Sequence, residues 1–174
     1  MNAFQWTEAT SVEQAIGQLD GKAVLKAGGV DLLDLMKEHL IEPTRLVNIR
    51  NIKGMDRIVD DEKNGLRIGP MVTLARLDTD PAVRRRYPAL ADAAGHAATP
   101  QIRNMATVGG NLLQRPRCWY FRNEQFHCKK KGGQTCYARL GRTSTTPSST
   151  TTLAPSYTPR APPPLWSRTA RSWS

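Results

Sequence analysis

The chain has 174 residues, 39% of them hydrophobic, which is enough for one domain or two small ones with a buried core. This composition excludes collagen-like and wholly disordered chains, and the lack of any apolar run of roughly 18 to 20 residues excludes a membrane span. The formal net charge of +10 leaves nucleic-acid binding open, although much of it lies in two runs, at 84–86 and 129–131, that are typical of a solvated surface.

Residues 1–52 are expected to form a small α/β unit, because short apolar runs alternate there with turn residues and helical spacings. The expected order is strand 4–9, helix 12–19, strand 23–27, helix 31–40 and strand 44–49. A capping box at Ser11 and Gln14 predicts the start of the first helix. Its apolar stripe consists of Val12, Ala15, Ile16 and Leu19. Asp31 is expected to cap the second helix rather than to face a ligand.

Residues 53–140 are expected to form a second, α+β unit. An Asn64-Gly65 dipeptide between two short apolar runs predicts a hairpin. The expected elements are strands 58–59 and 66–68, helices 73–77 and 88–98, and a helix that starts at Asp80-Pro81. Residues 102–112 are expected to be a loop.

Two segments with paired glycines are candidate phosphate sites. Gly28-Gly29 lies between a predicted strand and a predicted helix, where free backbone amides and the helix dipole favour an anion. Gly109-Gly110, flanked by Thr107 and Asn111, is chemically similar. Two such segments on one small protein could hold both ends of a pyrophosphate. The alternative is that both are ordinary turns, which need glycine in any case.

Three cysteines, Cys118, Cys128 and Cys136, lie among aromatic and cationic residues. Thiolates are soft ligands for zinc or for iron–sulfur clusters, and nearby cations would offset the negative charge of a cluster. His127 could supply a fourth zinc ligand, although it adjoins Cys128 and the geometry would be awkward. Structural thiols without a metal are the alternative.

Residues 141–174 differ in composition from everything before them, because 21 of these 34 residues are Ser, Thr or Pro. Such a segment cannot bury enough apolar surface to offset its ordering entropy, so we expect a disordered tail. A second explanation is a change of reading frame near Gly141. With a permitted choice of codons, the shifted frame contains a cysteine codon that overlaps Leu153 and Ala154, and this cysteine is a candidate fourth cluster ligand.

Several motifs, in order, resemble the FAD-binding subunit of the xanthine dehydrogenase family of molybdenum hydroxylases. They are KAGGVDLLDLMK from residue 26, RIGPMVTLARL from residue 67, ATPQIRNMATVGGNLLQRPRCWYFR from residue 98, and a cysteine segment that ends in GGQTCYA. The resemblance covers residues 4–140. It implies an α+β, two-subdomain FAD-binding fold of the vanillyl-alcohol oxidase type, incomplete here. The first subdomain would be residues 1–52, and the second residues 53–140, including a Cys-rich insertion at 115–139.

The resemblance also implies cofactors. In that family both Gly-Gly loops hold FAD. Carried over residue by residue, the FAD-binding residues are Lys26, Ala27, Gly28, Gly29, Val30, Asp31, Leu32, Leu33, Thr107, Val108, Gly109, Gly110 and Asn111. The cysteine segment is similar to the insertion of aldehyde-oxidoreductase and hydroxybenzoyl-CoA-reductase-like members. This likeness implies a [4Fe–4S] cluster with Cys118, Cys128 and Cys136 among its four ligands.

The function implied by the resemblance is electron transfer within a molybdenum-cofactor oxidoreductase that acts on aldehydes or N-heterocycles. The expected partners are a molybdenum-cofactor large subunit and a [2Fe–2S] small subunit, and no catalytic residue is expected because the flavin does the chemistry. The alternatives are a zinc- or nucleic-acid-binding module and a non-functional truncated product. Nucleic acid is not an expected partner, since Trp119 to Phe121 are too close together to stack successive bases. Residues 1–10 lack a secretory signal, which predicts a cytoplasmic location or export with a partner subunit.

Overall fold

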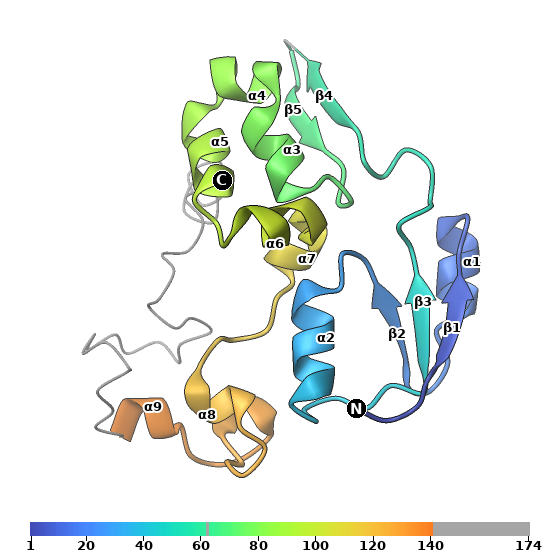
Figure 1. Cartoon of the computed structure of the whole chain (residues 1–174), viewed down its shortest axis with the longest axis vertical. Coiled ribbons are helices and arrows are strands. Elements are labelled where there is room, and N and C mark those ends of the chain that lie inside the picture. The colour runs from blue at the N-terminus through green and yellow to red at the C-terminus, as the bar shows by residue number, and fades with distance from the viewer. Residues whose placement is uncertain (62, 141–174) are drawn as a thin grey trace.

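The computed structural model describes residues 1–61 and 63–140. Its first unit is a three-stranded parallel sheet in the order β1-β3-β2 with two helices (Figure 1). The elements are β1 (Gln5–Glu8), α1 (Val12–Gly17), β2 (Ala23–Lys26), α2 (Val30–Lys37) and β3 (Arg45–Asn48). The α/β unit expected for residues 1–52 is therefore present, with each of its strands and helices close to the predicted range.

The core of this unit is small and centres on β3. Val47 on β3 is fully buried and packs with Ala9, Ala15 and Ile52. The Ser11 hydroxyl accepts a hydrogen bond from the Gln14 amide, as the predicted capping box requires. The predicted apolar stripe of α1 packs only at Ala15. Its other three members are exposed, namely Val12, Ile16 and Leu19.

The second unit combines a hairpin with five short helices. Its elements are β4 (Ile58–Asp61), β5 (Gly65–Ile68), α3 (Leu74–Thr79), α4 (Pro81–Arg86), α5 (Pro88–Gly95), α6 (Pro100–Met105) and α7 (Val108–Leu112). Strands β4 and β5 pair antiparallel, and the turn glycine Gly65 has φ +79°, as the hairpin prediction requires. Val72, Leu77 and Val83 form the centre of the core, under Ile58 and the rest of the hairpin.

The prediction of a loop over residues 102–112 is wrong, because α6 and α7 occupy most of it. Each helix begins at a threonine cap. The Thr99 side chain accepts from the Ile102 amide, and the Thr107 side chain accepts from the Gly110 amide. Pro100, at the first position of α6, has no amide hydrogen to leave unpaired. These caps outweigh the low helix propensity of the glycines.

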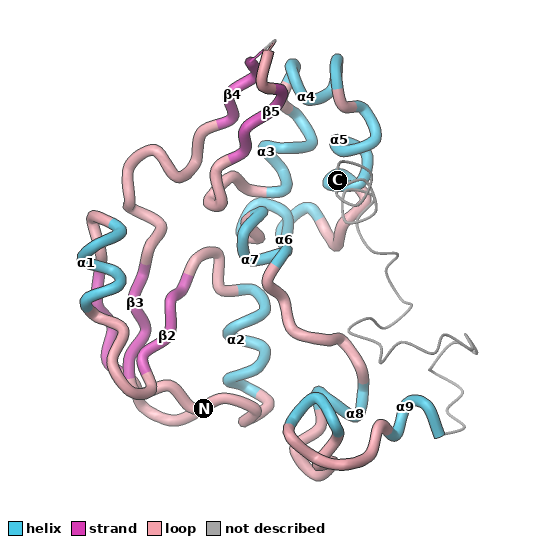
Figure 2. The backbone as a smooth tube through the Cα atoms, turned by 180° about the vertical axis from the view of Figure 1, so that it is seen from behind, coloured by secondary structure: helices cyan, strands magenta, loops and turns pink. Residues whose placement is uncertain are grey.

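The third part is the cysteine-rich segment, residues 115–139, with α8 (Trp119–Arg122), the 3-10 helix η1 (Lys129–Lys131) and α9 (Tyr137–Leu140). It follows the second unit in sequence but lies beside α2 of the first unit, as Figures 1 and 2 both show. Leu35 of α2 packs against Cys118, Phe121 and Cys128. The segment was expected to belong to the second subdomain, whereas its buried contacts are with the first unit.

Two further expectations concern the whole chain. Among residues 1–61 and 63–140, no helix combines the length and the apolarity that crossing a bilayer requires. The tail at 141–174, and the shifted-frame cysteine at Leu153 and Ala154, lie outside the described residues.

Candidate cofactor site

The two Gly-Gly segments lie against each other. Gly28 follows β2, and the chain at Met105 and Ala106 passes so close that a Cβ on Gly28 would collide with the Met105 carbonyl group. The Arg50 guanidinium reaches the Met105 sulfur from the first unit, at 4.0 Å. The starts of α2 and α7 are therefore neighbours, although they are more than seventy residues apart in sequence (Figure 1).

The first segment offers free backbone donors. Gly29, with φ +84°, is the N-cap of α2 and contributes no side-chain bond. Within residues 1–61 and 63–140, the amides of residues 28–32 donate to no carbonyl or side chain. Unpaired amides at the start of a helix attract anions, because they carry partial positive charge and point outward.

Two cations, Lys26 and Arg50, lie near this segment. The Lys26 ammonium lies 5.1 Å from the centre of the Trp6 ring. Burial lowers the pKa of Lys26, and the nearby positive charge of Arg50 lowers it further, whereas the negative charge of Glu8 acts in the opposite direction. An anion bound between Lys26 and Arg50 would offset the repulsion between them.

The second segment is built differently, since its amides are used within the protein. The Val108 amide donates to the Val72 carbonyl and the Gly109 amide to the Pro70 carbonyl, both at 2.8 Å. A Cβ on Gly109 would lie 2.9 Å from the Pro70 side chain, so this glycine permits close packing. In contrast to these amides, the Asn111 side chain has a buried Oδ1 atom with no hydrogen-bond partner among the described residues.

Asp31 does not cap α2, so that prediction is wrong. Its carboxylate accepts from Arg122 Nη2 at 2.6 Å and from the Arg115 amide at 2.9 Å. Asp31 is the second residue of α2 rather than the residue before it, and the arginine of the cysteine-rich segment competes for its charge. The carboxylate is thereby bonded away from the free amides.

The residues present fit an FAD pyrophosphate. Free amides at 28–32 and the Lys26 cation suit phosphate oxygens, whereas the buried Asn111 Oδ1 atom, an acceptor, would suit a hydroxyl of the cofactor and not its phosphates. Sequence analysis missed the buried Asn48, which is the last residue of β3, and Arg50, which lies two residues beyond it. The tendency of ligands to bind beyond the carboxyl ends of parallel strands could have indicated them.

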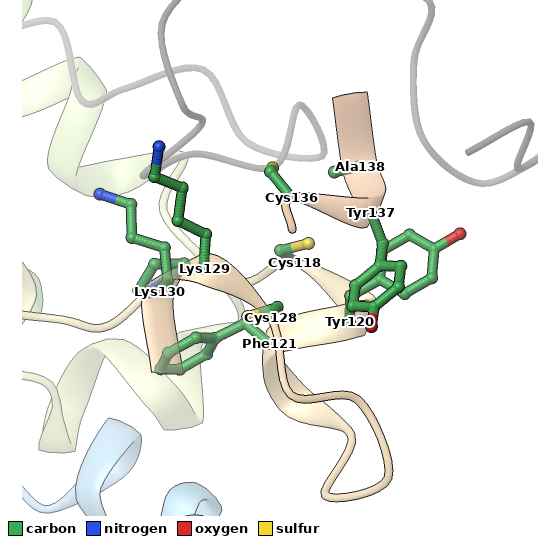
Figure 3. A pocket seen from close by; sticks show the side chains of 10 residues that line it. Cys118, Tyr120, Phe121, Cys128, Lys129, Lys130, Cys136, Tyr137 and Ala138 are labelled. Atoms are coloured by element: carbon green, nitrogen blue, oxygen red, sulfur yellow. The ribbon is translucent and has the colours of Figure 1, made fainter. Parts of the chain in front are cut away.

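The three cysteines line one small cavity in the cysteine-rich segment (Figure 3). Cys118 and Cys128 are buried, Cys136 is half-buried, and all three are free thiols. The Lys129 and Lys130 side chains extend on one side of the cavity, and Tyr120 and Tyr137 lie on the other side. The rest of the lining is Pro116, Tyr120, Phe121, Tyr137 and Ala138.

This cavity is not arranged around a single ion. In residues 1–61 and 63–140, no three His, Cys, Asp or Glu side chains come close enough together to hold one metal ion. His127 is exposed and does not line the cavity, so the structure gives a zinc site no support. The three thiols that line the cavity are the ligand type that iron–sulfur clusters use, and they are one fewer than the usual four.

Residues 2–154 match the family model described as the FAD binding domain in molybdopterin dehydrogenase. The chain belongs to this family. The resemblance to this family that was noted in the sequence is therefore confirmed.

Individual members of the family are also similar to this chain. The aldehyde oxidoreductase FAD-binding subunit PaoB of Escherichia coli K12 is 43% identical over 144 residues, which is 81% of this chain and 45% of PaoB. The nicotine 6-hydroxylase medium subunit of Paenarthrobacter nicotinovorans is 37% identical over 112 residues, or 63% of this chain and 39% of that subunit. The chain spans less than half the length of either relative.

Similar solved structures support the same family membership. Quinoline 2-oxidoreductase from Pseudomonas putida 86 superposes with a TM-score of 0.61 at 35% identity, covering 64% of this chain and 39% of that one. Carbon monoxide dehydrogenase from Hydrogenophaga pseudoflava gives a TM-score of 0.61 at 36% identity, with the same coverage. The matched part of the chain therefore has the FAD-binding architecture of the carbon monoxide dehydrogenase medium-chain type.

Proposed function

We propose that this chain is an FAD-binding electron-transfer subunit of a molybdenum-cofactor oxidoreductase that acts on aldehydes or N-heterocycles. The observation that carries the proposal is the approach of the two Gly-Gly segments at Gly28, beside five unpaired amides, in a chain of the FAD-binding family. The names of its relatives support the substrate class, since they include an aldehyde oxidoreductase subunit and a nicotine 6-hydroxylase subunit.

Each group of the site has a separate task in holding the cofactor. The amides of residues 28–32 would hold the pyrophosphate oxygens, and Lys26 would supply a cation beside them. Asn111 Oδ1 would accept a hydrogen bond from a hydroxyl of the cofactor and would then have a partner. Bound FAD would accept electrons and pass them on, and the protein binds and orients it without an acid or base of its own.

We further propose that the cysteine cavity holds a [4Fe–4S] cluster through Cys118, Cys128 and Cys136. The aromatic lining excludes water, and the adjacent lysines offset the charge of a cluster. The match to PaoB covers 81% of this chain, an extent that reaches across residues 115–139, and this supports the proposal. The fourth ligand would come from elsewhere.

The fold and the assembly belong to the same proposal. The described residues would be the two lobes of a vanillyl-alcohol oxidase-type fold, with the flavin held between them. A molybdenum-cofactor large subunit and a [2Fe–2S] small subunit would be the partners. Relatives named as a medium subunit and a medium chain support a multi-subunit assembly.

The test is flavin binding by the purified full chain. We expect yellow protein with close to one FAD per chain after mixing with FAD and gel filtration. The Asn111→Ala variant should elute with less flavin while keeping its helical content, and Gln101→Ala, at an exposed position of α6, is the matched control. A wild-type chain that folds but remains colourless after mixing contradicts the proposal.

A further inference from the structure

The Arg122 side chain joins the cysteine-rich segment to α2. Arg122 is the last residue of α8, and its guanidinium donates to Asp31 Oδ1 at 2.6 Å and to Asp34 Oδ2 at 3.0 Å. The side chains of Arg122 and Asp31 are only 12% and 16% exposed. An ion pair shielded in this way is weakened less by salt and solvent than an exposed one.

The same guanidinium also fixes the start of the segment. Arg122 Nε donates to the Pro116 carbonyl at 2.8 Å, and Nη2 donates to the Arg115 carbonyl at 3.0 Å. The Arg115 amide in turn donates to Asp31 Oδ2 at 2.9 Å. Both carboxylate oxygens of Asp31 are thus bonded by the cysteine-rich segment.

This bonding matters for the first Gly-Gly segment, because Asp31 lies in the first turn of α2, among the unpaired amides of residues 28–32. A carboxylate without a partner at this place would repel a phosphate. Arg122 and the Arg115 amide offset that charge and hold the carboxylate toward the cysteine-rich segment. Loss of these contacts would leave the Asp31 charge unpaired beside the amides that would hold a phosphate.

The position of the thiols also depends on packing between the cysteine-rich segment and α2. Leu35, one turn along α2 from Asp31, belongs to one buried cluster with Cys118, Phe121 and Cys128. Cys118 is the N-cap residue of α8, the short helix that Arg122 ends. Displacement of Arg122 from α2 would therefore move two of the three thiols.

We propose that Arg122 is a positioning residue that couples the first Gly-Gly segment to the cysteine cavity, so that filling either site strengthens binding at the other. The coupling is reciprocal, as linkage between two binding sites requires. The inference rests on the proposed FAD and cluster sites.

The first test compares Arg122→Met with Arg117→Met in the full chain. Arg117 lies in the same segment and is exposed, and no ion pair or side-chain hydrogen bond is found for it among the described residues, so its variant removes the same charge without the contacts. We expect Arg122→Met to weaken FAD binding about tenfold, within the range of coupled sites. Arg117→Met should change it less than about twofold. Equal effects of the two variants overturn the proposal.

The second test measures the coupling itself. FAD affinity is determined by flavin fluorescence for the anaerobically iron-reconstituted chain and for the same chain after chelation. We expect chelation to weaken FAD binding in the wild type and to have no effect in Arg122→Met. The double variant Asp31→Asn/Arg122→Met should recover part of the FAD affinity, because the unpaired carboxylate is gone. A chelation effect that persists in Arg122→Met contradicts the coupling.

Failure of the proposed function can be told apart from failure of the coupling. If the wild type binds FAD but no iron, the cluster proposal is wrong. The comparison of Arg122→Met with Arg117→Met then decides whether Arg122 supports FAD binding at the first Gly-Gly segment. If the wild type binds iron but no FAD, the iron content of the two variants is the measurement. Loss of iron in both variants, or in neither, overturns the positioning role of Arg122. Binding of neither cofactor overturns both proposals. The Arg122→Lys variant keeps the positive charge but not the guanidinium hydrogen bonds. Its far-UV circular dichroism spectrum shows whether a loss of binding comes from lost positioning or from lost folding.

Discussion

Gly28 packs against the carbonyl group of Met105 with no room for a side chain between them. The contact joins the two units at the proposed pyrophosphate site. Its geometry is fixed by backbone on both sides, so neither partner can rotate away as a flexible side chain would.

Replacing Gly28 with alanine should therefore separate the two Gly-Gly segments. We expect a loss of about 1–3 kcal/mol in the free energy of unfolding, typical of overpacking, together with loss of FAD binding. Urea unfolding and flavin titration measure the two effects. Gly17→Ala is the matched control, since nothing lies within 4 Å of a Cβ at that position. A Gly28→Ala protein with unchanged flavin affinity would show that the close approach does not shape the site.

Lys26 should cause the affinity of the first Gly-Gly segment for an anion to fall as the pH becomes alkaline. Its pKa is lowered in the free protein by burial and by Arg50, and a bound phosphate raises it again. Binding then favours the protonated ammonium, so affinity is highest below the pKa of free Lys26 and falls as the pH rises through it. Calorimetry with ADP suits this test, because its phosphates do not titrate there. Lys26→Met should flatten the profile, and Lys22→Met, at an exposed site, should leave it unchanged.

Asn111 should affect stability and binding in opposite directions. Its buried Oδ1 atom has no partner among the described residues, and such an atom typically costs about 1–3 kcal/mol. Asn111→Ala should therefore raise the free energy of unfolding of the flavin-free chain while weakening FAD. Gln101→Ala, at an exposed position of α6, should do neither. If Asn111→Ala destabilises the flavin-free chain, the side chain has a structural partner and the assignment is wrong.

The cysteine cavity should hold a complete cluster only when an outside ligand fills its fourth position. The described residues supply three thiols, and an iron without a protein ligand is exposed to oxidation and loss. Anaerobic reconstitution should give less than about four irons per chain, and added small thiol should raise the content toward about four. Cys118→Ser should lose iron under both conditions. A stable four-iron cluster without added thiol contradicts this prediction.

Local patterns were enough to predict much of the fold. Alternating apolar residues indicated the strands, and caps such as Asp80 marked helix starts that the structure confirms. The same rule applied to Thr99 and Thr107 would have found α6 and α7, but the glycines at 109 and 110 favoured a loop interpretation. The Arg122 contact to Asp31 could not be found in this way, because no local pattern indicates which arginine meets a carboxylate 91 residues away.

The position of the cysteine-rich segment also has a consequence for synthesis of the chain. The Leu35 face of α2 is complete long before Phe121 and Cys128, which cover it, have been translated. At roughly 5–20 residues per second, the 91 residues between Asp31 and Arg122 correspond to a delay of about 5–20 s. During that interval the nascent chain carries an uncovered apolar and acidic helix face, the kind of surface that chaperones bind and that aggregation begins from.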